Sequence, residues 1–185
     1  MTGTNLAPGL LIAMPQLDDP NFARSVVLMI EHNDQGSFGL VINQPSAITA
    51  SELLDSLSMR WGGAAETVVW SGGPVSRTTG WVLHEPVPTL VGDGTSTIGP
   101  GVALSTSPER LRALAARPPA RLRLLLGSSG WGPGQLAREM AQGSWLHADL
   151  DPEIVFDLDA DEMWRAAVES LGILPDAVVV GRGVH

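Results

Sequence analysis

The hexapeptide Gly130–Gln135, GWGPGQ, combines the features of a ligand-binding turn. It follows the apolar run RLRLLL at 121–126 and precedes good helix formers up to Gln142. Because proline favours the first helical turn, we expect a helix to begin near Gly132-Pro133. The free N–H groups and the dipole of a helix start favour a phosphate, a carboxylate or a carbonyl oxygen. The alternative interpretation is a tightly packed turn without a ligand.

More specific phosphate chemistry is excluded by composition and spacing. A P-loop ends in Gly-Lys-Ser/Thr, and the chain contains no lysine, its 11 basic residues all being arginine. A dinucleotide fingerprint would need a glycine where Gln135 stands. The Gly-x-Ser-x-Gly spacing of a nucleophile elbow is also absent between Gly127 and Gly130.

His84 is the histidine that is best placed for a ligand. It ends an expected strand at 80–84 behind the loop that contains Gly72 and Gly73, where a polar side chain can face a cleft. An ordinary hydrogen-bonded histidine at a strand end is the alternative. The four histidines lack the spacing of a zinc site, and no motif supports a Ser-His-Asp hydrolase, so we expect no catalytic set.

Seven acidic residues lie between 149 and 162, a density that invites a calcium interpretation. Glu162 stands where the glycine of a calcium loop should be, and Val168 where its bidentate glutamate should be. A solvated strand edge followed by a helix start that favours carboxylates explains the run without metal. We predict no intrinsic metal and no cofactor.

Length and composition indicate one soluble domain over residues 1–185. A chain of this size can bury a sufficient core, and the absence of cysteine suits the cytosol and excludes thiol chemistry. The apolar N-terminal run lacks a basic start and is interrupted by Pro8, Gly9 and Pro15, so we expect neither a signal peptide nor a membrane span. We therefore expect a cytoplasmic protein.

The net charge of −9 argues against direct nucleic-acid binding, because it repels a phosphate backbone. Five arginines between 110 and 123 form a local positive patch only if those of the helix and of the next strand share one side. A solvated face is the alternative. We expect the partner to be an unknown protein or a small anionic ligand, and expect no membrane partner.

Hydrophobic periodicity and turn residues predict alternating strands and helices. Trp61 and Trp131 stand beside glycines in expected loops and are candidates for an exposed platform, although packing over the loop is the commoner outcome; the other four tryptophans fit the core. Thr49 with Glu52 forms a capping box, and Ser107-Pro108 starts a second helix. Strands are expected at 9–14, 25–31, 37–43, 66–70, 80–84, 101–105, 121–126, 145–150 and 154–158, and helices at 50–59, 107–117, 132–143 and 159–171.

The order of several segments resembles the AlgH/YqgE family of bacterial proteins. These segments are GLLIAMPQLDDPNFARSVVLMIEHNDQGSFGLVINQP, SGGPV with WVLH, GWGPGQL with GSW, and MWRAAVESLGI. The resemblance implies a single α+β domain with a mixed, bifurcated β-sheet, partly closed like a barrel and surrounded by helices. It implies no enzyme activity, and the family label of a transcriptional regulator describes a phenotype better than a mechanism.

The motif residues of the resemblance include Asp18, Phe22, Gly39 and Pro45. The chain departs from the family pattern at Ser128-Ser129 and at Ala137, where a tyrosine-containing turn and a glutamate are usual. From these residues we expect a non-enzymatic regulatory or adaptor protein; the alternative is a protein or enzyme that binds a small phosphorylated or nucleotide ligand. The expected single surface comprises Asn43, Gly72, Gly73, His84, Gly130, Trp131, Gly134 and Gln135.

Overall fold

The computed structural model describes residues 5–15, 22–90, 92 and 94–178, so Asp18 lies outside the described residues. The strands are β1 (Gly9–Ala13), β2 (Val26–Asn33), β3 (Gly36–Val41), β4 (Pro45–Thr49), β5 (Val68–Ser71), β6 (Val75–His84), β7 (Thr95–Gly99), β8 (Val102–Ser105), β9 (Leu122–Trp131) and β10 (Trp145–Ala148). The helices are α1 (Ala50–Ser56), α2 (Pro108–Ala116), α3 (Gln135–Ala141), α4 (Pro152–Phe156) and α5 (Ala160–Glu169).

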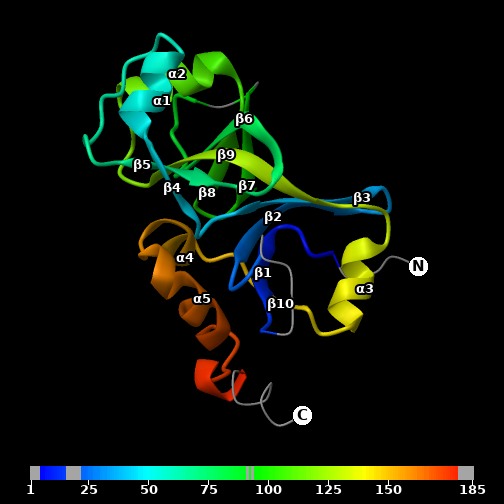
Figure 1. Cartoon of the computed structure of the whole chain (residues 1–185). Helices are drawn as coiled ribbons and strands as arrows, with labels where there is room; N and C mark the ends of the chain where they lie inside the picture. The colour runs from blue at the N-terminus through cyan, green and yellow to red at the C-terminus, as the bar shows by residue number, and fades with distance from the viewer. Residues whose placement is uncertain (1–4, 16–21, 91, 93, 179–185) are drawn as a thin grey trace.

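The strands form a curled sheet that branches at β9 and is open like half a barrel (Figure 1). Its main path runs in the order β10-β1-β2-β3-β9-β6-β8-β7, and β5 adds to β9 from the side. The β5–β9 pair is parallel, while the other pairs are antiparallel among the described strands. The predicted α+β class with a mixed, bifurcated sheet is therefore confirmed.

Strand β9 extends further than the sequence predicts. We expected the strand to stop at Leu126, but it passes through Gly127 to Trp131. Gly127 has a φ of 88°, which glycine adopts without strain, and the chain continues beyond it with Ser128 paired to Val75. The last residues of β9 then pair with β3, which satisfies their backbone hydrogen bonds. The expected loop is thus the place where the sheet branches.

Helices cover both faces of strands β1, β2 and β3. Side chains alternate along these strands, so Leu10 and Ile12 face one side and Leu11 faces the other. The first side packs against α4 and α5, and the Trp164 indole donates a hydrogen bond of 2.8 Å to the Ala13 carbonyl. The second side packs against Trp131 and α3.

A separate apolar cluster lies under α1 and α2, over β5, β6 and β9. Thr49 caps α1 by accepting a hydrogen bond of 3.1 Å from the Glu52 N–H, and Ser107 caps α2 in the same way, as predicted. Both helices therefore begin where their sequences indicate. Helix α1 ends at Ser56, earlier than expected.

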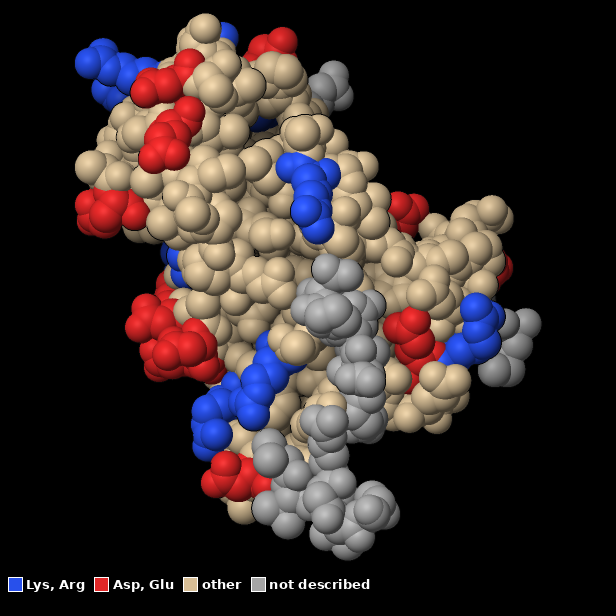
Figure 2. Space-filling view, in the orientation of Figure 1, with Lys and Arg blue, Asp and Glu red and all other residues tan. Residues whose placement is uncertain are grey.

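The prediction of a strand at 154–158 is wrong, because residues 152–156 form α4. Asp151 accepts a hydrogen bond from the Glu153 N–H, and Pro152 occupies the first turn. A short apolar run does not distinguish a buried strand from a buried helix, and here the capping residues decide. Acidic side chains gather on the surface over α4 and the start of α5 (Figure 2).

Two other connections also differ from expectation. The β2–β3 hairpin has only Asp34 and Gln35 between its strands, because Asn33 pairs with Gly36 and its side chain accepts from the Gln35 N–H. No strand was predicted between 84 and 101, but this segment contains the edge strand β7.

Candidate functional site

The Gly130–Gln135 motif links the end of β9 to α3. Gly130 and Trp131 still belong to the sheet, where they pair with Phe38 and Ser37 of β3. Gly134 then turns the chain with a φ of 74°, and α3 begins at Gln135. The helix therefore starts later than predicted and has only seven residues.

The Gln135 side chain occupies one of the backbone N–H donors that the sequence predicts for a ligand. The Gln135 Oε1 accepts from the Gly132 N–H at 3.0 Å, and its Nε2 donates to Glu139 at 2.9 Å. The Glu139 carboxylate also accepts from the indole N–H groups of Trp131 at 3.1 Å and Trp145 at 2.8 Å. The GWGPGQ turn is thus fixed by an internal hydrogen-bond network.

Trp131 is buried, which agrees with packing over the loop and not with an exposed platform. Its side chain is 5% exposed and stacks on Phe22 with ring centroids 6.2 Å apart, and Trp145 meets its edge at 5.8 Å. The continuation of β9 turns this indole toward the core beneath α3. Trp61 is half-buried and donates its indole N–H to the Ala64 carbonyl.

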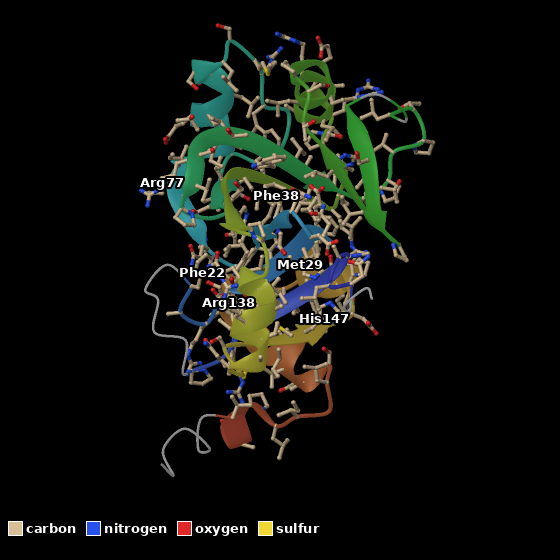
Figure 3. All side chains as sticks on the ribbon, turned by 90° about the vertical axis from the view of Figure 1, so that its right-hand side faces the viewer. Phe22, Met29, Phe38, Arg77, Arg138 and His147 are labelled. Carbon is tan, nitrogen blue, oxygen red and sulfur yellow. The ribbon has the colours of Figure 1, made fainter. Side chains whose placement is uncertain are left out.

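A hollow of about 610 Å³ lies between the first turn of α3 and the tip of the β2–β3 hairpin. The His32 Nδ1 lies 2.7 Å from the Ser37 Oγ at its edge. Figure 3 looks at the side that carries α3, with Arg138 on this helix and Phe22 beside it. The hollow is lined by Asn5, His32, Asn33, Asp34, Ser37, Gly134, Leu136 and Ala137.

The hairpin residues of this hollow were not among the predicted site residues. The polar tip sequence HNDQG lies between the strands predicted at 25–31 and 37–43, and its residue types match no binding motif. Its proximity to α3 arises from the β3–β9 pairing, which no local pattern reveals. Of the predicted residues, Gly134 lines the hollow, and Trp131 lines a shallower one of about 280 Å³ beside the same hairpin.

Gly72 and Gly73 are buried beneath β9. A Cβ atom at Gly72 would overlap the Gly127 carbonyl oxygen, and one at Gly73 would overlap the Ser128 carbonyl oxygen. Gly73 also has a φ of 142°. Both glycines therefore allow close backbone packing, and neither reaches the surface.

Asn43 holds the turn before β2. Its Oδ1 accepts from the Val26 N–H at 3.0 Å, and its Nδ2 donates to the Arg24 carbonyl at 2.9 Å. Arg24 has a φ of 53°, and its guanidinium lies 5.0 Å from the centroid of the Trp164 ring. Asn43 is thus a structural clamp that also lines a hollow of about 390 Å³ with Arg24 and Arg165.

His84 is fully buried and both of its ring nitrogens have partners. The Glu85 carbonyl, 2.7 Å from Nδ1, can only accept, so Nδ1 carries the proton and Nε2 accepts from the Ser105 hydroxyl at 2.8 Å. Thr95 joins the network through the Ser105 Oγ at 2.7 Å. Burial lowers the pKa of His84, opposed by the smaller effects of the Glu85 carbonyl and carboxylate.

The structure does not bring the eight predicted residues to one exposed surface. His84 on β6 pairs with Leu122 at one end of β9, whereas Gly130 lies near the other end. The two positions on β9 are separated by about 26 Å along the strand, at roughly 3.3 Å per residue. Gly72, Gly73, Trp131 and His84 are buried, whereas Gly130 and Gly134 are exposed. Whether the exposed residues contact a ligand stays a prediction.

Comparison with known proteins gives a consistent result across the chain. A family model described as AlgH-like matches residues 10–176. The chain belongs to the AlgH-like family. It is 43% identical to a UPF0301 protein of Myxococcus xanthus, over 98% of this chain and 99% of the relative, and 42% identical to a UPF0301 protein of Anaeromyxobacter sp. strain K, over 96% and 94%.

Two solved structures share the AlgH-like fold with this chain. The solution structure of the AlgH protein from Pseudomonas aeruginosa has a TM-score of 0.78 at 38% identity, covering 97% of this chain and 95% of that one. The X-ray structure of protein DIP2367 from Corynebacterium diphtheriae has a TM-score of 0.72 at 23% identity, covering 91% and 89%. The second likeness concerns the fold alone.

Two arginines of the expected positive patch face other parts of the AlgH-like fold. Arg121 forms an ion pair with Asp157, which, with nearby acidic groups, raises the pKa of Arg121. Arg123 donates to the Phe156 carbonyl at 2.8 Å, with its guanidinium 4.5 Å from the centroid of the Trp70 ring. Both cations are therefore committed to the segment that contains α4.

Three residues of the acidic run form a compact group at the start of α5. Carboxylate oxygens of Asp159, Asp161 and Glu162 lie within 4.8 Å of one another, and all three residues are exposed. Exposed carboxylates at a helix N-terminus are favoured by the helix dipole.

Among residues 5–15, 22–90, 92 and 94–178, no helix is both long and apolar enough to cross a bilayer.

Proposed function

We propose that this chain is a non-enzymatic regulatory or adaptor protein of the cytoplasm. Its partner would bind at the hollow between the β2–β3 hairpin and α3, which we call the hairpin hollow. The observation that carries the proposal is the combination of polar hairpin side chains and the exposed first turn of α3 around about 610 Å³ of open space. Such a surface offers donors and acceptors for a partner segment.

The surroundings of the hairpin hollow support a preformed binding surface. The hairpin is anchored through β3 to β9, and α3 is anchored through Glu139 to Trp131 and Trp145. A partner would therefore bind without first ordering these elements, which reduces the entropic penalty of association.

The polar groups around the hollow are better suited to binding than to catalysis. His32 and Ser37 form a hydrogen-bonded pair, but in the described part of the chain no carboxylate bonds to the His32 ring to orient it as a base. The Glu139 carboxylate is already engaged by two indoles and one amide.

The absence of cysteine supports the cytoplasmic location.

Site-specific photo-crosslinking in producing cells tests the proposal. A benzophenone amino acid placed at Asn33 and, separately, at Ala137 probes the two sides of the hollow, and Glu169 on α5 provides an exposed control. We expect the same protein to be crosslinked from Asn33 and Ala137 and not from Glu169. Equal products from all three positions, or none from the first two, would contradict the proposal.

A second experiment distinguishes an adaptor from a protein that binds a phosphorylated or nucleotide ligand. A thermal-shift screen with nucleotides and phosphorylated metabolites measures this directly, since a ligand at 100 times its Kd stabilises by about 2.7 kcal/mol. Stabilisation that is lost in Gln135→Ala would favour the ligand-binding alternative at the GWGPGQ turn. We expect no such stabilisation, because the Gln135 side chain occupies the Gly132 N–H.

A further inference from the structure

A second cavity, of about 250 Å³, lies on the opposite part of the fold, between α1, α2 and the sheet. We call it the leucine cavity. Leucines dominate its walls, and they come from both helices and from β9. Its apolar wall residues include Leu53, Leu57, Met59, Leu111, Leu124 and Leu126.

The leucine cavity exists because β6 has a glycine where its neighbours carry side chains. Thr78, Gly80 and Val82 alternate along one face of the strand, and all three line the cavity. A Cβ atom at Gly80 would meet nothing closer than the Leu126 Cδ2 at 3.8 Å, an ordinary contact distance. Gly80 is itself solvent-exposed and lines the cavity. The space is therefore a missing side chain in the layer between helices and sheet.

Two of the hydroxyl groups that line the cavity are engaged within the protein. The Ser105 hydroxyl bonds to His84 and Thr95, and the Ser107 hydroxyl accepts from the Arg110 N–H. A buried water needs two to four polar partners, and these hydroxyls have few bonds left to offer. An apolar occupant therefore fits the walls better than water.

The size of the cavity favours a small molecule over a docked protein. Engineered apolar cavities of about 150 Å³ bind benzene, so about 250 Å³ accommodates a larger ring system or a short acyl chain. Leu57 is 45% exposed at the mouth, while Leu53, Met59 and Leu111 are half-buried. A stable protein interface buries about 800 Å² on each partner, far more than this one exposed leucine supplies.

We infer that the leucine cavity binds a small apolar molecule, of the class of fused aromatic rings or short acyl chains, that enters past Leu57 and rests against Gly80. The site is separate from the hairpin hollow, since no residue that the structure describes lines both. The inference therefore does not rest on the proposed function.

Fluorescence titration with the neutral probe N-phenyl-1-naphthylamine tests this inference. The probe should brighten with the wild-type protein and be displaced by naphthalene. Gly80→Phe should fill the cavity and weaken probe binding at least about tenfold, equivalent to about 1.4 kcal/mol. Gly80→Ala is the matched control, because one methyl group leaves most of the space open, and its affinity should stay within about twofold.

A second variant and a folding measurement keep the result interpretable. Leu111→Gln places a polar group on the wall and should also weaken binding, without filling the space. Circular dichroism and urea unfolding establish that each variant is folded. No probe binding to the wild type, or equal binding to wild type and folded Gly80→Phe, would overturn the inference. Wild-type binding that only Gly80→Phe and Leu111→Gln weaken supports it.

Discussion

The Trp145 indole donates its N–H to the Glu139 carboxylate at 2.8 Å, which joins α3 to the edge strand β10. The same carboxylate accepts the Trp131 indole N–H at the end of β9. One side chain on a seven-residue helix therefore links the branch strand and the edge strand of the sheet. Trp131 and Gln135 of the GWGPGQL segment both bond to this carboxylate.

We expect Glu139→Leu to destabilise the protein by about 2–3 kcal/mol, because it leaves two indole donors without an acceptor. Urea unfolding measures the change. Glu169→Leu, at an exposed position of α5, is the matched control and should shift the free energy of unfolding by less than about 0.5 kcal/mol. Equal effects of the two substitutions would show that the Glu139 network is not a structural centre.

Two glycines of the motifs, Gly73 and Gly130, should differ in how much their substitution by alanine changes stability. Gly73→Ala should destabilise by more than about 2 kcal/mol, because its Cβ would overlap the Ser128 carbonyl at a positive φ. Gly130→Ala should change stability by less than about 1 kcal/mol, since its Cβ would lie 4.0 Å from the Ser37 carbonyl oxygen. Thermal unfolding compares them, and a well-folded Gly73→Ala protein would refute the packing role.

Arg121, just before β9, and Arg123, on β9, should differ in their importance for stability. Arg123→Met should destabilise by about 1–3 kcal/mol, because it removes a hydrogen bond to the Phe156 carbonyl and a cation–π contact with Trp70. Arg121→Met removes an exposed ion pair and should have a smaller effect. Chemical denaturation of both variants decides, and the reverse order would contradict this assignment.

His84 should make stability decrease in mildly acidic solution. Its pKa is lowered in the folded protein, so below the ordinary value of about 6.5 the unfolded chain binds a proton that the folded chain does not. This contribution is present above pH 6.5 and is lost as pH falls toward the lowered pKa, by at most about 1.4 kcal/mol per pH unit.

The His84→Gln variant isolates this contribution. The difference in unfolding free energy between wild type and variant should shrink between pH 7.5 and pH 5.5. Denaturant unfolding at a series of pH values measures it. Parallel curves for the two proteins would mean that His84 does not titrate differently on folding.

Local sequence signals predicted several elements correctly because the deciding contacts are local. Thr49 and Ser107 cap helices through residues three positions ahead, and the β2–β3 hairpin joins neighbouring strands. The motif order over the chain also predicted the family, which the AlgH-like match at residues 10–176 confirms.

The same reasoning failed where a distant partner decides the conformation. Gly127 has the composition of a loop, yet the strand continues because β6 and β3 satisfy the backbone beyond it. Residues 154–158 also have the composition of a strand, yet α4 forms at 152–156. There the local cap at Asp151 and Pro152 selects the helix, and no distant partner is needed.

The sequence by itself determined the α+β class, the family, the alternating apolar strands and the caps of two helices. Only the tertiary structure decided that Trp131 is buried, that Glu139 accepts both indoles, and that the hairpin tip and α3 border one hollow. The reason is that β9 takes its hydrogen-bond partners from strands far away in the chain. The glycines and serines at the end of β9 are compatible with several backbone conformations. Their hydrogen-bond partners on β3 and β6 select one of them.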